Sequence, residues 1–223
     1  MRIQWLGHAA FKLSGAGQTI YIDPSRMEPL GPEVKQLFDH PEPADVVLFT
    51  HDHADHCDPA PLAKMLKADT TLVGPLSCRS KLGLEMHTVE PGTKLTIGAA
   101  TICAVHAYNI TRHRMPGTPF HPRGVGVGYL VTIEGHTVYH AGDTEPIPEM
   151  EHLGRVDVAL LPVDGHYTMP PEEAMQAAAA IRCGVVIPMH FFTTPAEEVV
   201  AAAKRHPNVS LRLLEPGDTY EPQ

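Results

Sequence analysis

Residues 50–59 read THDHADHCDP, a stretch with three histidines and three aspartates in ten positions. Such a stretch is either a solvated loop rich in histidine or a metal-binding loop. Side chains two positions apart in an extended segment point the same way, so His51 and His53 can bind one ion. Asp55 and His56 lie past the bend and can bind a neighbouring ion. Imidazole and carboxylate ligands suit zinc and other first-row metals, and this spacing is rare by chance, so we predict a metal site.

Further candidate ligands stand where predicted buried strands end. His106 follows TICAV, Asp143 follows TVYHAG and His190 follows GVVIPM. Strand ends at one edge of a sheet converge in space, so side chains distant in sequence can meet around one point. We therefore expect these three residues to join the ligands of the opening stretch. A shared Asp143 carboxylate would bridge two ions about 3.5–4 Å apart.

Short apolar runs alternate with helical patterns along the chain and predict an α/β fold. Strands are expected at 2–6, 18–22, 45–49, 70–73, 93–97, 100–105, 125–133, 136–140, 156–162, 184–188 and 209–214. Helices are expected at 59–67, 75–83, 147–153, 171–182 and 195–206. The segments QTIYIDP and ADVVLFTH are echoed later by HTVYHAGDT and VDVALLPV. Two similar β-rich halves, each followed by helices, predict two sheets packed face to face in a single domain spanning 1–223.

Composition and charge limit the classes of partner and the cellular compartment that we expect. The net charge of −9 makes the nucleic-acid backbone a poor partner. Four cysteines at wide spacing favour a reducing compartment. We expect no signal peptide and no membrane partner, because no apolar run approaches membrane-spanning length. The prediction is a cytoplasmic protein that acts on a small molecule and binds neither nucleic acid nor membrane.

The same motifs carry a family resemblance. THDHADH is similar to the T-H-x-H-x-D-H signature of the metallo-β-lactamase superfamily, HAGDT resembles its later Gly-Asp element, and IPMHF its final histidine element. WLGHAAFKL, with YIDP and HAGDT, further resembles a branch of metal-dependent hydrolases similar to the ascorbate-phosphate lactonases. The resemblance spans nearly the whole chain and implies a four-layer αββα sandwich with a dinuclear site at the edge of the two sheets. Relatives often oligomerise, so a homo-oligomer is one expectation.

The resemblance also implies how the ligands divide. It gives one metal to His51, His53 and His106, and the other to Asp55, His56 and His190, with Asp143 bridging. The expected cofactors are two divalent ions, with Zn²⁺ first and Mn²⁺ or Fe as alternatives. His121, in PFHPRG, is the alternative to His106, which is preferred because it lies at a strand end. His8, in GHAAF, is either a buried histidine that donates to a backbone carbonyl or a residue near the metals.

This ligand set predicts a hydrolase. Two divalent metals lower the pKa of a bridging water from 15.7 toward neutrality and present hydroxide as the nucleophile. An ester, lactone, amide or phosphodiester bond would fit this chemistry. Asp55 is the candidate catalytic residue, because it could take a proton during turnover.

The segment 109–124 offers a substrate clue. It is long for a loop within a compact domain and contains Arg112, Arg114 and Arg123, which could pair with a phosphate or carboxylate. The alternative is a solvated, proline-stiffened loop. His166 in VDGHYTM departs from the residue that relatives usually carry, so it is either a substrate contact or exposed.

Two rival functions fit parts of the same sequence. An iron-bearing redox member of the fold would use similar ligands but normally appends an electron-transfer domain, for which 223 residues leave no room. A non-catalytic, metal-stabilised binding module would need no open coordination position, whereas catalysis would. Turnover that a chelator abolishes and added metal restores would separate the enzyme from the module.

Overall fold

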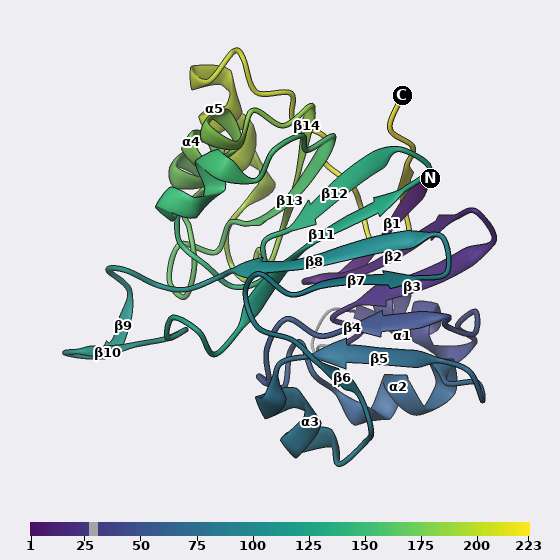
Figure 1. Cartoon of the computed structure of the whole chain (residues 1–223). Helices are drawn as coiled ribbons and strands as arrows, with labels where there is room; N and C mark the ends of the chain where they lie inside the picture. The colour runs from purple at the N-terminus through teal and green to yellow at the C-terminus, as the bar shows by residue number, and fades with distance from the viewer. Residues whose placement is uncertain (27–30) are drawn as a thin grey trace.

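The computed structural model describes residues 1–26 and 31–223 of the chain, and two β-sheets form its centre (Figure 1). In spatial order, the first sheet holds β15 (Thr219–Tyr220), β1 (Arg2–Gly7), β2 (Ala10–Gly15), β3 (Gln18–Ile22), β4 (Val46–Leu48), β5 (Thr71–Gly74) and β6 (His87–Thr88). The second holds β14 (Val185–Met189), β13 (Val158–Pro162), β12 (His136–His140), β11 (Val127–Ile133), β8 (Ala100–His106) and β7 (Lys94–Ile97). A small hairpin of β9 (His113–Met115) and β10 (Thr118–Pro119) projects from the body (Figure 1).

Helices cover the outer face of each sheet (Figure 1). The first sheet carries α1 (Gly31–Asp39), α2 (Pro59–Met65) and α3 (Leu76–Leu82). The second carries α4 (Pro171–Ile181), α5 (Ala196–Arg205) and the 3₁₀ helix η1 (Pro148–His152). This arrangement of helix, sheet, sheet and helix confirms the predicted αββα sandwich.

Strand alternation creates the three apolar layers. Ile20 and Ile22 of β3 pack between the sheets, whereas Tyr21 packs outward against α1 and α2. Val138 and Tyr139 of β12 divide in the same way, with Tyr139 packed toward α4. Successive side chains of a strand point to opposite faces, so a strand covered on both sides reads as a continuous apolar run.

The internal echo of the sequence corresponds to a repeated topology. β3 pairs antiparallel with β2 on one side and parallel with β4 on the other, where Ile20 lies opposite Val46. β12 likewise pairs antiparallel with β11 and parallel with β13, where Val138 lies opposite Val158. The carboxyl ends of β4 and β12 lead directly into the segments that hold His51 and Asp143.

Some elements differ from the sequence prediction. β2, α1 and the hairpin within 109–124 were not predicted. β2 does alternate, because Phe11 and Leu13 are buried whereas Lys12 and Ser14 are half-buried, so its pattern was present in the sequence. The strand expected at 209–214 makes only one bridge, between Leu211 and Val186 at the edge of the second sheet. Among the described residues, no helix is long and apolar enough to cross a lipid bilayer.

Candidate metal centre

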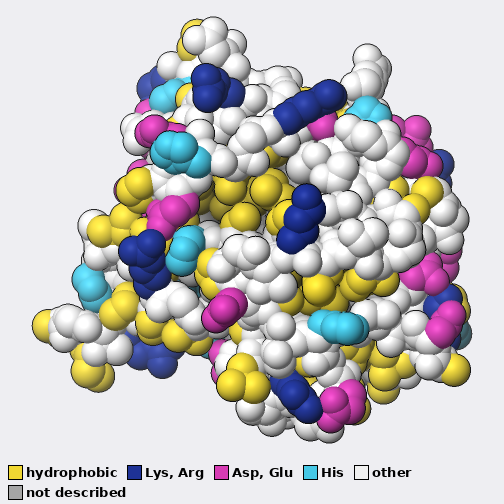
Figure 2. Space-filling model, viewed as in Figure 1, with side chains coloured by type: hydrophobic (Ala, Val, Ile, Leu, Met, Phe, Trp, Pro, Cys, Tyr) yellow, Lys and Arg dark blue, Asp and Glu magenta, His cyan; other side chains and the backbone are white. Residues whose placement is uncertain are grey.

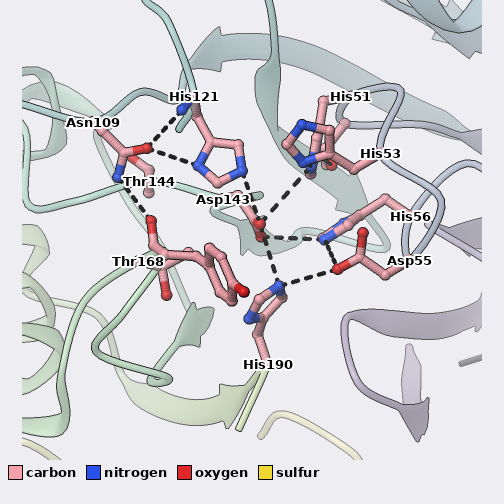
Figure 3. Close-up of polar contacts among 12 residues, drawn as sticks. His51, His53, Asp55, His56, Asn109, His121, Asp143, Thr144, Thr168 and His190 are labelled. Atoms are coloured by element: carbon pink, nitrogen blue, oxygen red, sulfur yellow. Dashed lines mark hydrogen bonds and ion pairs between the residues drawn. The ribbon is translucent and has the colours of Figure 1, made fainter. Parts of the chain in front are cut away.

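The predicted ligands other than His106, together with the alternative His121, gather around the carboxylate of Asp143 (Figure 3). Its Oδ2 lies 3.2 Å from Nε2 of His121 and 3.2 Å from Nε2 of His190. The same oxygen is 3.8 Å from Nε2 of His51, and Oδ1 is 3.3 Å from Nε2 of His56. Asp143 therefore lies between two clusters of nitrogen and oxygen atoms.

Each cluster is compact enough to hold one ion. The atoms offered by each lie within 4.8 Å of one another. The first cluster contains His51, His53, His121 and Asp143, and the second contains His8, Asp55, His56 and His190. Nitrogen and carboxylate oxygen donors in groups of four suit zinc and related divalent metals.

Unpaired buried atoms show that these residues fit a cation. Nε2 of His56, Nε2 of His190 and Oδ1 of Asp143 are buried and have no hydrogen-bond partner. A buried polar atom left without a partner costs about 1–3 kcal/mol, so such atoms are rare in folded proteins. Three of them converge here, and a positive ion is the partner that imidazole lone pairs and a carboxylate share.

The histidines are held so that one ring nitrogen faces the cluster. His56 donates from Nδ1 to Asp23 Oδ2 at 2.7 Å. The same carboxylate accepts from the backbone and hydroxyl of Thr50, at 2.7 and 2.5 Å. The Thr50 hydroxyl oxygen in turn accepts from Nδ1 of His51 at 3.0 Å. A proton fixed on Nδ1 leaves the Nε2 lone pair free for a metal.

Two further rings are supported in the same manner. His121 donates from Nδ1 to Asn109 Oδ1 at 2.7 Å, and His190 donates from Nδ1 to Asp164 Oδ2 at 3.0 Å. Asp164 also accepts from the hydroxyl of Thr168. Partners of this kind orient ligand rings and raise their basicity.

The charges of the neighbouring side chains divide three of the histidines into two kinds. Burial opposes charge on His56, but Asp143 and Asp23 outweigh it and raise its pKa to about 10. Burial also opposes charge on His190, yet Asp143 raises its pKa well above the ordinary range. Burial together with the charge on His190 lowers the pKa of His8 to about 4. The carboxylates around His56 and His190 thus favour positive charge at this point, and bound cations would supply it in place of protons.

Strained backbone marks the same region. Asp23, His8, His190 and Phe192 have φ angles of 46°, 48°, 54° and 47°, a region that residues other than glycine seldom adopt. The His8 carbonyl accepts from the backbone N–H of His190 at 3.1 Å and from the Trp5 indole at 3.0 Å. Such conformations persist only where the surrounding structure fixes them, and they cluster at functional sites.

His8 lies in the cluster rather than in an ordinary core. Its Nε2 is 3.1 Å from Asp55 Oδ2, and its ring centroid is 4.0 Å from that of His190. Its side chain therefore contacts two predicted ligands, which agrees with the alternative that placed it near the metals.

The preference for His106 over His121 needs correction, because the structure places His121 in the cluster and His106 outside it. His106 is still paired within the sheet, opposite Val127, and its ring lies 6.2 Å from that of Tyr108. A strand end determines where the backbone lies but not the side to which the side chain points. His121 reaches the cluster because Asn109 holds both its backbone N–H and its ring, each at 2.7 Å.

The segment 109–124 is anchored at its base. The Glu145 carboxylate, 2% exposed, accepts from the backbone N–H groups of Ile110, Thr111 and Arg112 at 2.9, 2.8 and 2.6 Å. The Asn109 backbone N–H donates to the His121 carbonyl at 2.9 Å and closes the loop. The chain between these anchors forms the projecting hairpin.

The three arginines of this segment have different surroundings. Arg112 pairs with Glu173 at 3.0 Å and with Glu145 at 3.3 Å. Arg123 pairs with Glu149 at 2.7 Å and lies over the ring of Tyr108. Arg114 lies over the Phe120 ring, 6.0 Å from its centroid. Of the three, it alone lines the cleft beside the cluster.

That cleft has a volume of about 430 Å³. It is lined by residues of both clusters and by Arg114, Phe120, Tyr167 and Phe192. Asp55, the candidate catalytic residue, lines it too. His166 is exposed outside these walls and packs edge-on against Tyr167, with 4.5 Å between ring centroids.

Sequence reasoning missed the residues that support the ligands. Asp23, Asn109 and Asp164 each hold one ligand ring, yet none was predicted in the site. A signal was present for two of them, because Asp23 and Asp164 also follow buried strands. No such signal marks Asn109, whose role depends on the closure of the loop.

Comparison with known proteins agrees with this fold and site. A family model described as the β-lactamase superfamily domain matches residues 2–190. A UPF0173 metal-dependent hydrolase of Methanoculleus marisnigri is 37% identical over 230 residues, which cover 99% of this chain and 96% of that protein. A solved structure from Parabacteroides distasonis has a TM-score of 0.83 and 32% identity, covering 95% of this chain and 91% of the other.

A metallo hydrolase from Ignicoccus hospitalis also shares the architecture, with a TM-score of 0.81 and 27% identity. The alignment covers 100% of this chain and 99% of that one. The family match, the close relatives and the gathered His and Asp residues all agree. The chain therefore belongs to the β-lactamase superfamily, as a member of its UPF0173 metal-dependent hydrolase family.

Proposed function

We propose that this protein is a dinuclear hydrolase, with Zn²⁺ as its metal, that cleaves an ester, lactone or phosphodiester bond in a small anionic substrate. The observation that carries the proposal is the convergence of unpaired buried atoms on Asp143 from two adjoining clusters. The first metal would be held by His51, His53, His121 and Asp143. The second would be held by Asp55, His56, His190 and Asp143.

Bound divalent metals supply a water of lowered pKa and a Lewis acid for the substrate oxygen. The protein contributes the orientation of its ligands. Asp23, Asn109 and Asp164 keep the Nδ1 proton of their histidine partners away from the cluster. His8 holds Asp55 Oδ2, at the edge of the cleft, where Asp55 is the candidate to accept a proton during turnover.

The small-molecule substrate is supported by the size of the cleft, which at about 430 Å³ lies within the usual range of ligand sites. A cytoplasmic location and a homo-oligomeric state stay predictions, as does the expectation that neither nucleic acid nor membrane is a partner.

Elemental analysis of the purified protein tests the dinuclear centre. We expect about two zinc atoms per chain, the usual content of a bridged site, and a sharp fall in Asp143→Ala. Asp58→Asn is the matched control, because Asp58 lies in the same stretch but caps α2 by accepting from Ala60 N–H at 2.9 Å. Less than one metal per chain after reconstitution would contradict the proposal, and bound iron would favour the redox alternative.

Turnover is tested separately with panels of esters, lactones and phosphodiesters. Hydrolysis should disappear with a chelator and return with added zinc. A fully loaded protein that hydrolyses no member of any panel would favour the binding module over the enzyme.

A further inference from the structure

Three aromatic rings form a continuous wall of the cleft beside the metal ligands. Tyr167 has ring centroids 5.0 Å from Phe120 and 5.5 Å from Phe192. The rings come from three separate segments, after β10, β13 and β14. Phe192 also lies beside His190, with 4.9 Å between centroids, so the wall adjoins the metal cluster directly.

Two of these rings remain open to solvent although such exposure is unfavourable. Tyr167 is 37% exposed and Phe192 is 45% exposed. Phe192 in addition has the positive φ noted above, which costs about 1–2 kcal/mol for a residue with a side chain. An ordinary surface turn would place glycine or asparagine there. An exposed aromatic surface inside a cleft is typical of a binding site for a flat apolar group.

Arg114 supplies a cation at the edge of this wall. It is exposed, lines the cleft and has no carboxylate partner among the side chains that the structure describes, whereas Arg112 and Arg123 are both paired with glutamates. Figure 2 shows hydrophobic side chains on the projecting hairpin with cationic side chains close by. An unpaired guanidinium that borders a cleft can bind a carboxylate or phosphate through two parallel hydrogen bonds.

We infer that the cleft selects substrates in which a flat apolar group carries an anionic substituent. The apolar group lies against Phe120, Tyr167 and Phe192, and the anion binds Arg114. This assignment rests on the proposed hydrolase function and specifies its substrate class. The scissile bond then lies on the side of Phe192 that faces the metal ligands.

Equilibrium binding of naphthalene-2-sulfonate tests this inference without turnover. The probe has a flat ring and an anion, has no hydrolysable bond, and coordinates metals poorly. Methanesulfonate carries the anion without the ring, and 2-naphthylmethanol carries the ring without the anion. Fluorescence or calorimetric titrations on the zinc-loaded full-length protein should show that the combined probe binds at least about tenfold more tightly than either part, as additive contacts predict.

Two variants and one control assign the contacts. Arg114→Gln should weaken naphthalene-2-sulfonate binding about tenfold, the effect of one charge-assisted hydrogen bond, and leave 2-naphthylmethanol unchanged. Phe192→Leu should weaken both naphthyl probes about three- to tenfold through lost ring contact. Arg123→Gln, in the same segment but outside the cleft, should match wild type.

Equal binding of naphthalene-2-sulfonate by wild type and Arg114→Gln would overturn the inference. So would binding of methanesulfonate as tightly as the naphthyl anion, or an equal loss in Arg123→Gln. Since the probe is not a substrate, failure of the proposed hydrolase function would show as absent turnover, whereas failure of this inference would show in the titrations alone.

Discussion

Asp164→Asn tests whether metal binding depends on a residue that does not itself face the metal. Oδ2 of Asp164 accepts from Nδ1 of His190 at 3.0 Å and from the Thr168 hydroxyl. Oδ1 accepts from the backbone N–H groups of His166 and Tyr167 at 2.8 and 2.6 Å. Each carboxylate oxygen therefore faces only donors.

Asparagine has only one oxygen, so it cannot accept hydrogen bonds at both of the positions that the Asp164 carboxylate oxygens occupy. In one orientation its NH₂ group faces the His190 ring and the Thr168 hydroxyl, and in the other it faces two backbone N–H groups. The side chain is 1% exposed, so water cannot readily replace the lost acceptor. One buried donor left unpaired costs about 1–3 kcal/mol, and each 1.4 kcal/mol corresponds to a factor of ten. We therefore expect zinc affinity to fall about 10- to 100-fold, the usual effect of losing a supporting partner.

Competition between the protein and a chelator of known zinc affinity measures this change, with folded protein quantified by circular dichroism. Asp157→Asn is the matched control, because Asp157 also accepts from a backbone N–H, of Thr137 at 2.8 Å, and pairs with Arg155 away from the site. The reasoning is refuted if Asp164→Asn keeps wild-type affinity within about twofold, or if Asp157→Asn loses as much.

Three further predictions concern the loop, the ligands and acid stability. His121→Ala should remove about one metal per chain and His106→Ala none, and elemental analysis distinguishes the two; an equal loss in both would contradict the placement of His121. Glu145→Gln should speed hydrogen exchange of amides 110–112 about tenfold or more, because a neutral amide accepts less strongly; unchanged exchange would show that the anchor is dispensable. Burial opposes the charge on Asp157, but the Thr137 N–H and then Arg155 lower its pKa below the ordinary 3.8. Its carboxylate thus stabilises the fold above about pH 4, and this stabilisation is lost as the pH falls through the lowered pKa. Urea denaturation from pH 3 to 6 should therefore show that the free energy of unfolding falls less with acid in Asp157→Asn than in wild type. An equal dependence of this free energy on pH in both proteins would contradict the prediction.

The parts of the fold that the sequence predicted are those with a strong local signal. The runs that became β3, β4, β12 and β13 are apolar on both faces, because each is covered by a sheet on one side and by helices on the other. The ligands of the opening stretch could be predicted because their spacing alone brings the side chains together. β9 and β10 carry no such signal because they have only three and two residues, and β2, which pairs with the neighbouring β1 and β3, does not form a continuous apolar run.

The rest of the site depends on directions that sequence does not encode. His106 and His121 both looked suitable, and the choice between them is made by the Asn109 amide and by the side to which each residue turns. Asp23 and Asp164 were overlooked because a supporting carboxylate resembles any aspartate that ends a strand. The arginines of 109–124 looked equivalent until the positions of their glutamate partners were known.

The closed base of the hairpin has a practical consequence for engineering. The Glu145 anchor and the Asn109–His121 clasp fix both ends of the segment, so the residues between them can be exchanged as a cassette. Grafts of varied sequence and length at 113–119 would alter one wall of the cleft and leave the sandwich and its ligands in place. Variants that differ only in residues 113–119 could then differ in substrate selectivity while they share one scaffold.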